Sequence, residues 1–253
     1  MRNIGGGPGQ GAAVVVGCWA MTIAPDFLSA LACAAGKFPG SRTLPWPAPK
    51  QLGGFVTFAD FAEWQRVILG FRLSDGVPLN MVDLFDRALK LYLVAWLDFD
   101  LVTAGEMAAL AALEHSLRDC YLGDFRERHT KKVVARAKSE ERLPTLKENF
   151  RPETIPLAAL LEHMHRRGGL TDDQLPCIRK YGGSVMRLLT VEADPNLADM
   201  RNVRAHGNPF GSGYQSGLLE LVRDLIEYAY RDRIRTAKGS ISGARSIPPS
   251  STP

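Results

Sequence analysis

From Phe55 onward, apolar residues recur at the three- to four-residue spacing of amphipathic helices, with few β-branched runs and almost no alternation of period two. The first helix has Thr57 or Asp60 as its candidate N-cap. The pattern predicts helices over these approximate ranges: 57–69, 80–98, 103–122, 154–167, 171–189 and 215–236. We therefore expect an all-α bundle of about five to seven helices.

Glycine and proline mark the breaks between the predicted helices. Residues 74–78 read Ser-Asp-Gly-Val-Pro and predict a turn, because glycine tolerates positive φ and proline removes a backbone donor. Gly168 and Gly169 predict a helix end. Gly182 and Gly183 predict an irregularity, and residues 194–196 predict a further turn.

Two stretches of the longest predicted helices have distinct surfaces. Residues 91–97, LYLVAWL, are apolar on every side, so either the core or a second protomer must cover them. The next helix has a core stripe formed by Leu110, Leu113, Leu117 and Tyr121. Glu114 and Arg118 lie on an adjacent face at positions i and i+4, where an exposed ion pair contributes only about 0.2–0.5 kcal/mol.

Both ends of the chain have compositions that argue against packing. Residues 1–54 contain GGGPGQG and FPGSRTLPWPAPK, and we expect a poorly ordered leader there. Residues 239–253 are rich in Gly, Ser and Pro, and we expect a disordered tail. The predicted helical domain is therefore 55–238.

The sequence favours a cytoplasmic protein without a membrane segment. No apolar run approaches the roughly 20 residues that span a bilayer. Residues 15–18 resemble a lipoprotein cleavage site, but the apolar run before Cys18 is short and no basic region precedes it. The four cysteines show no metal-ligand spacing, which is typical of buried thiols in a reducing compartment.

The net charge of +4 is concentrated in one basic segment, residues 126–151. This segment holds nine Lys or Arg and four Glu, so its own net charge is +5. It is compatible with a polyanionic partner, because basic residues that neutralise phosphates release counterions. A solvated linker or an ordinary charged helix is the alternative interpretation.

The sequence gives no reason to expect a metal or another cofactor. His163 and His165 stand at positions i and i+2 of a predicted helix and therefore point to different faces. No GxSxG motif, paired carboxylates or defined cysteine nucleophile stands out. The remaining candidate chemistry lies in residues 200–209, MRNVRAHGNP, between a turn and a strongly amphipathic helix.

The stretch LADMRNVRAHGN resembles the motif of the HEPN superfamily, in which an arginine, a polar residue, three variable residues and a histidine follow one another. The order of predicted helices over 55–238 is also similar to that of this superfamily. The resemblance implies an all-helical, homodimeric, metal-independent endoribonuclease, active in defence, in stress response or as the toxin of a toxin and antitoxin pair. Its implied partners are RNA and an antitoxin or other regulatory protein.

The residue types suit this reaction. The ribose 2′-hydroxyl attacks the adjacent phosphate, and His206 can carry protons because an imidazole titrates near neutral pH. Arg201 can hold two phosphate oxygens and stabilise the charged transition state. Asn202 can orient either the imidazole or the phosphate. Glu114, Arg118 and Arg204 are accessory candidates.

The resemblance also implies how the two protomers cooperate. One histidine cannot easily be both acid and base, and members of this superfamily pair their motifs across a two-fold interface. The products would be a 2′,3′-cyclic phosphate and a 5′-hydroxyl, and DNA would be a poor substrate because it lacks the attacking hydroxyl.

A structural interpretation of the same residues stays open. Arg201 could bond carbonyls at a helix end, and His206 with Gly207 could form an ordinary helix C-terminus. The chain would then be a non-catalytic HEPN-like module for nucleic-acid binding, nucleotide binding or dimerisation. Convergence of Arg201 and His206 on an open basic cleft favours catalysis, whereas a His206 that is buried or points away from Arg201 favours the module.

Overall fold

The computed structural model of the protein describes residues 23–48, 54–137, 150–190, 192–205 and 215–243. The α-helices are α1 (Pro25–Ala35), α2 (Phe61–Leu69), α3 (Leu79–Val94), α4 (Leu101–Ala137), α6 (Leu157–Arg166), α7 (Pro176–Tyr181), α8 (Leu197–Ala205), α9 (Leu218–Ala229) and α10 (Arg231–Gly243). Short 3-10 turns are η2 (Pro152–Thr154), η3 (Asp172–Gln174) and η4 (Met186–Leu189), and the strands are β1 (Arg42–Pro45) and β2 (Phe55–Phe58).

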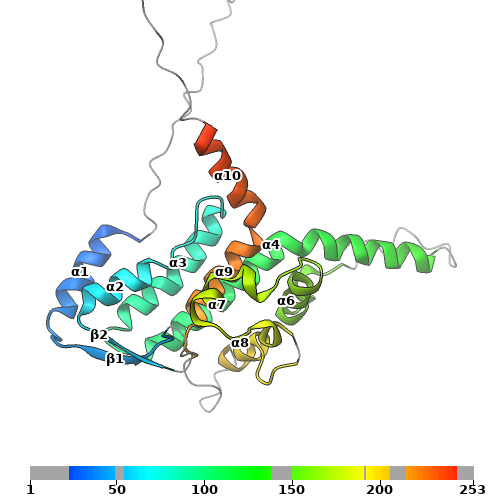
Figure 1. Cartoon of the computed structure of the whole chain (residues 1–253). Coiled ribbons are helices and arrows are strands. Elements are labelled where there is room, and N and C mark those ends of the chain that lie inside the picture. The colour runs from blue at the N-terminus through cyan, green and yellow to red at the C-terminus, as the bar shows by residue number, and fades with distance from the viewer. Residues whose placement is uncertain (1–22, 49–53, 138–149, 191, 206–214, 244–253) are drawn as a thin grey trace, which may run out of the picture.

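Helix α4 is the central element of the molecule. It packs against α3 along its N-terminal half and also contacts α6, α8 and α9. Its core stripe is confirmed, since Leu110, Leu113 and Leu117 have no exposed surface. Figure 1 shows the C-terminal part of α4 as a rod that extends beyond the body formed by the other helices.

The apolar segment 91–97 is covered by the core of this chain. Tyr92, Leu93, Ala95 and Trp96 are all buried. Gly105 of α4 permits the close approach, because a Cβ there would lie 2.6 Å from the Cδ2 atom of Tyr92. Of the two predicted coverings, the structure therefore provides the core, and this segment is no argument for a second protomer.

Local signals in the sequence placed several element ends correctly. Asp60 caps α2, since its carboxylate accepts a hydrogen bond of 2.8 Å from the Glu63 backbone N–H. Gly76 adopts the predicted positive φ, at 101°. A Cβ on this glycine would lie 2.8 Å from the Cα of Ile234 in α10, so the turn also needs glycine for packing.

The leader expected over 1–54 is in part a folded segment, in contrast with the prediction. Residues 23–48 supply α1 and β1, and Ile23 and Trp46 belong to the core. The Trp46 ring contacts the rings of Phe58, Trp64, Phe71 and Tyr92 at centroid distances of 5.2 to 6.3 Å. Burial of these large rings outweighs the glycines and prolines around them. Residues 1–22 and 49–53 lie outside the described residues.

The all-α prediction is corrected to a mostly helical fold with one small sheet. Strands β1 and β2 pair antiparallel, with Arg42 opposite Phe58 and Pro45 opposite Phe55. The hydroxyl oxygens of Thr43 and Thr57 lie 2.7 Å apart across this pair. Each strand has only four residues, too few for a clear alternation in the sequence.

Three predicted helices have different limits in the structure. Helix α4 continues from the predicted 103–122 to Ala137 and so includes the first half of the basic segment, whose residues 138–149 lie outside the described residues. The range 171–189 divides into η3, α7 and η4, with Gly182 at a φ of 82°. The last helix divides at Tyr230 into α9 and α10.

The C-terminal end of the fold also differs from the prediction. Helix α10 includes 239–243, which the composition assigned to the tail, and residues 244–253 lie outside the described residues. Within the part of the chain that the structure describes, no helix is both long enough and apolar enough to cross a membrane.

The folded leader makes a stability prediction. We expect Trp46→Ala to lower the free energy of unfolding by about 3–5 kcal/mol, because it removes a buried ring from the aromatic cluster. The control is Phe38→Ala in the same segment, whose side chain is 52% exposed and should change stability by less than about 0.5 kcal/mol. Urea unfolding of both variants provides the measurement, and equal stabilities would show that the leader does not pack.

Candidate functional site

Helix α8 presents the motif arginine to α4. Leu197, Ala198 and Met200 are buried and fix one face of the helix on the body. The Asn196 side chain, which precedes α8, accepts hydrogen bonds from the backbone N–H groups of Ala198 and Asp199 at 2.9 and 3.0 Å. These contacts set the rotation of α8, which directs Arg201 toward α4.

Arg201 meets two of the predicted accessory residues. Its Nη2 lies 3.0 Å from Oε2 of Glu114, and the other oxygen of the same carboxylate, Oε1, lies 2.8 Å from Nη2 of Arg118. Glu114 is therefore shared between two guanidinium groups. We call Arg201, Glu114 and Arg118 the Arg–Glu–Arg cluster.

Arg118 connects the cluster to a third part of the chain. Its Nη1 donates to the carbonyl of Pro152 at 2.5 Å, and its Nη2 donates to the carbonyl of Ile155 at 2.8 Å. The predicted ion pair between Glu114 and Arg118 is confirmed, but it is not an ordinary surface pair. The two side chains are only 14% and 21% exposed, and they join α4, α8 and the η2 turn.

The remaining motif residues are described only in part. The Oδ1 atom of Asn202 accepts a hydrogen bond of 3.3 Å from Nη1 of Arg201, and the Asn202 side chain is exposed. The side chain of Arg204 and the whole of His206 lie outside the described residues. The structure thus brings together four of the six predicted site residues.

Two glutamates of α4 bind Arg201 and Gln215, which stand before and after the undescribed residues 206–214. Glu114 binds Arg201 shortly before this segment, and Glu106 accepts a hydrogen bond of 2.7 Å from the backbone N–H of Gln215 directly after it. Glu106 is fully buried. The two glutamates are eight residues apart on one helix, so their positions differ by a rise of about 12 Å and a rotation of about 80°.

The Arg–Glu–Arg cluster suits an anion better than a metal ion. Two guanidinium groups around one carboxylate leave a net positive charge, and the Arg201 side chain is 38% exposed to an incoming ligand. A guanidinium offers five N–H donors in a planar fork that fits phosphate oxygens. Throughout the described ranges, no group of three or more His, Cys, Asp or Glu side chains is arranged to hold a metal ion.

Sequence reasoning missed a second polar contact on α4, centred on His163. The two histidines of α6 do point to different partners, since Nδ1 of His165 lies 3.0 Å from the Leu170 carbonyl oxygen. Nε2 of His163 lies 3.0 Å from Oδ2 of Asp124, and its Nδ1 lies 2.9 Å from Nη2 of Arg128. Because the guanidinium can only donate, Nδ1 accepts and Nε2 carries the proton.

The environment of His163 favours the neutral ring. Its side chain is only 4% exposed and lies between the rings of Tyr121 and Phe125. Burial lowers the pKa of His163 below its usual value, and the charge of Arg128 lowers it further, against the opposing effect of Asp124. No signal in the sequence distinguished this histidine, because its partners lie on another helix.

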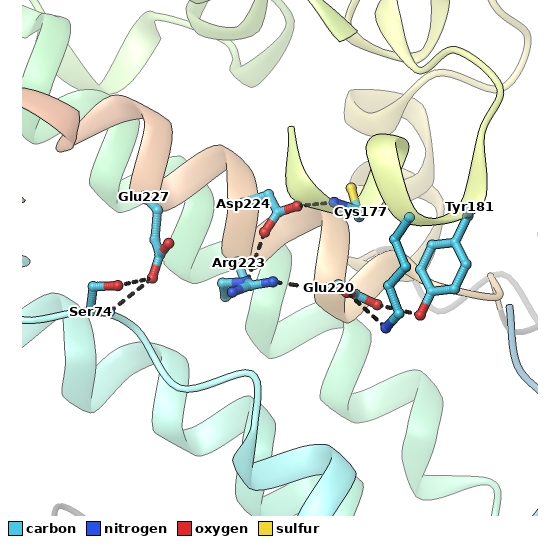
Figure 2. A network of polar contacts seen from close by, with 8 residues as sticks. Ser74, Cys177, Tyr181, Glu220, Arg223, Asp224 and Glu227 are labelled. Carbon is cyan, nitrogen blue, oxygen red and sulfur yellow. Dashed lines mark hydrogen bonds and ion pairs between the residues drawn. The ribbon is translucent and has the colours of Figure 1, made fainter. Parts of the chain in front are cut away.

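A buried acidic network on α9 was also missed. Glu220, Asp224 and Glu227 stand on successive turns of the helix, and Figure 2 shows their carboxylates among donors from other segments. Asp224 accepts a hydrogen bond of 2.6 Å from the backbone N–H of Cys177, and Glu220 accepts one of 2.7 Å from the Tyr181 hydroxyl. The sequence signal for this network is the spacing ExxxDxxE, which places the three carboxylates on one face of a helix.

This network joins segments and shows no arrangement for catalysis. Arg223 forms an ion pair of 2.8 Å with Asp224, and Glu227 accepts hydrogen bonds from both the backbone and the hydroxyl of Ser74. Burial raises the pKa of Asp224 and of the Cys177 thiol, so this thiol is a poor nucleophile at neutral pH. The network fixes α7 and residue 74 on α9.

The cluster makes a stability prediction. We expect Glu114→Ala to lower the free energy of unfolding by about 1–3 kcal/mol, because it leaves two partly buried guanidinium groups without their shared acceptor. Glu162→Ala is the matched control, since Glu162 pairs with Arg166 at the same i,i+4 spacing but the two side chains are 46% and 67% exposed. The control should change stability by less than about 0.5 kcal/mol in urea unfolding. Equal effects would mean that Glu114 makes only a surface pair.

His163 makes a prediction about pH. The folded state binds fewer protons than the unfolded state between the lowered pKa of His163 and its usual value of about 6.5. The free energy of unfolding should therefore fall as the pH is lowered through this window. In His163→Gln, whose amide can keep both polar contacts, this part of the loss should disappear. Urea unfolding at pH 7.5 and 5.5 tests it, and an unchanged pH dependence in the variant would contradict it.

Comparisons of the chain with models of protein families, with curated proteins and with solved structures gave no match. The site is therefore defined by its own geometry: an arginine of α8 pairs with a glutamate of α4, which also pairs with a second arginine.

Proposed function

We propose that the chain is a metal-independent endoribonuclease of HEPN-like type, with Arg201 binding the scissile phosphate. The observation that carries this proposal is the position of Arg201, which an ion pair with Glu114 orients while 38% of the arginine side chain stays exposed. A second guanidinium, that of Arg118, shares the same carboxylate. Preorganised positive charge of this kind stabilises a transition state in which negative charge develops on phosphate oxygens.

The proposed reaction uses the motif residues as follows. The ribose 2′-hydroxyl loses its proton to a base and attacks phosphorus, and the bond from phosphorus to the 5′-oxygen breaks. The leaving oxygen takes up a proton, which gives a 2′,3′-cyclic phosphate and a 5′-hydroxyl. His206 carries one of these protons, Arg201 stabilises the phosphate oxygens, and Asn202 orients the arginine to which it is hydrogen-bonded.

A second copy of the chain would complete the proton transfers. One imidazole serves as base or as acid in a given step, so two His206 side chains from a two-fold dimer would supply both roles. This part rests on the resemblance of LADMRNVRAHGN to the HEPN motif, as do an antitoxin partner and a role in defence or stress response. Sedimentation of the purified chain should give twice its mass of 27.7 kDa.

A non-catalytic helical module is the second candidate, and one observation favours it. The Glu114 carboxylate already occupies donors of both Arg201 and Arg118, and Arg118 also binds two carbonyl groups. A purely structural role, joining α4, α8 and the η2 turn, is sufficient to account for these contacts. On this view Arg201 contributes to stability, and the chain does not cleave RNA.

Cleavage of labelled RNA in excess chelator separates the two candidates. We expect Arg201→Ala and His206→Ala each to lower the rate by about 100-fold or more, because each removes a group that acts in the transition state. Glu114→Gln keeps a hydrogen-bond acceptor but loses the charge, and it should lower the rate by about 10-fold. Arg166→Ala, at an exposed arginine of α6, is the control and should leave the rate unchanged.

The proposed reaction also predicts which products form and which results would contradict it. A deoxyribose at the scissile position should prevent cleavage, and the products should carry a cyclic phosphate. Equal cleavage by wild type and both variants would assign the activity to a contaminant or another site. Absence of cleavage on varied RNAs, with folded protein in urea unfolding, would favour the module.

A further inference from the structure

A basic and aromatic groove lies on α4 beyond the candidate site. Its volume is about 400 Å³, and its walls are the projecting part of α4 and the chain from residue 150. The cations Arg128, Lys132 and Arg151 line it together with the rings of Phe125, His129 and Phe150. We call this surface the α4 groove.

The charge of the α4 groove is positive. None of the described residues that line it is Asp or Glu. On α4, Asp124 accepts from His163 and Glu127 pairs with Lys131 at 2.6 Å, whereas Glu153 of η2 is exposed and does not line the groove. Lys132 and Arg151 are exposed, so their charges face solvent and are available to a polyanion.

The aromatic rings are placed beside cations. The guanidinium of Arg128 lies 4.3 Å from the centre of the Phe125 ring, and that of Arg126 lies 5.7 Å from the centre of the Phe150 ring. The ring of His129 lies 5.4 Å from that of Phe150. Alternating rings and cations are typical of surfaces that bind single-stranded nucleic acid, because rings stack on unpaired bases while cations bind phosphates.

The α4 groove and the Arg–Glu–Arg cluster share one structural connection. Arg118 of the cluster binds the carbonyl of Ile155, and Ile155 also lines the groove. Along α4, Phe125 follows Arg118 by two helical turns, a rise of about 10 Å, so both residues lie on one side of the helix. A single-stranded nucleic acid lying in the groove can therefore continue toward Arg201.

We propose that the α4 groove binds an unpaired segment of the RNA next to the scissile phosphate. Phe150 stacks on a base, and Lys132 and Arg151 bind backbone phosphates. The groove thereby selects single-stranded RNA and places the strand along α4. This inference rests on the proposed function only for the identity of the scissile site, because binding can be measured without cleavage.

Fluorescence anisotropy with a labelled single-stranded DNA oligonucleotide measures binding alone, since DNA lacks the attacking 2′-hydroxyl. The test variant is Lys132→Glu with Arg151→Glu. The matched control is Lys131→Glu with Arg166→Glu, which makes the same change of charge at two exposed residues that pair with Glu outside the groove. The full-length chain is used throughout, and RNA cleavage is measured in parallel.

We expect the groove variant to bind at least about 10-fold more weakly than wild type, and the control to stay within about twofold. Loss of two phosphate contacts should also reduce the slope of log K against log salt by about 1.4. Phe150→Ala should weaken binding about fivefold through the loss of stacking. A duplex RNA of equal length should bind more weakly than the single strand.

Several results would overturn the inference. Equal weakening by the groove variant and its control would show that overall charge, not the groove, attracts the oligonucleotide. Unchanged binding by the groove variant, or duplex binding as tight as that of the single strand, would also reject it. Binding in the groove without RNA cleavage would reject the proposed function alone, whereas cleavage with unchanged binding by the groove variant would reject the inference alone.

Discussion

The packing of α4 is the constraint on which the rest of the structure depends. Its buried positions include Ala109, Leu110, Ala112 and Leu113, with no exposed surface, and α3, α6, α8 and α9 all contact the helix. The small alanines allow close approach of neighbouring helices, and the leucines fill the space between them. Because these helices share one support, groups on α4 determine where distant parts of the chain meet.

Carboxylates carry much of this organisation. On α4, Glu106 accepts a hydrogen bond from the backbone N–H of Gln215, and Asp119 accepts one of 2.7 Å from the Tyr230 hydroxyl. Glu114 forms an ion pair with Arg201. On α9, Asp224 accepts a hydrogen bond from the backbone N–H of Cys177. Burial of a charged or polar group is unfavourable without a partner, so each of these contacts fixes one arrangement of the segments against less well paired alternatives.

The same arrangement links stability to the proposed chemistry. Glu114 forms ion pairs with both Arg201 and Arg118. Arg118 in turn donates hydrogen bonds to two carbonyl groups in the segment that forms one wall of the α4 groove. A rigid support of this kind favours catalysis, because an arginine that is already oriented loses little freedom when it binds a phosphate. It also explains why the cluster can serve a structural role in the second candidate function.

The sequence by itself determined the features that depend on neighbouring residues. Helical periodicity predicted α2, α3 and the start of α4, Asp60 was a correct cap, and the spacing of Glu114 and Arg118 predicted their ion pair. Each follows from contacts within four residues along the chain. The composition of residues 23–48 was misleading, because glycine and proline are local signals and burial of Trp46 is not.

Only the tertiary structure decided which distant residues meet. Nothing local in the sequence places Arg201 on Glu114, His163 between Asp124 and Arg128, or the chain after residue 150 beside the basic end of α4. These contacts arise when the apolar faces of α6, α8 and α9 pack on α4, and that packing fixes the positions of polar groups far apart in sequence. The sequence thus determined the local elements and the candidate motif, whereas packing decided the site around Arg201.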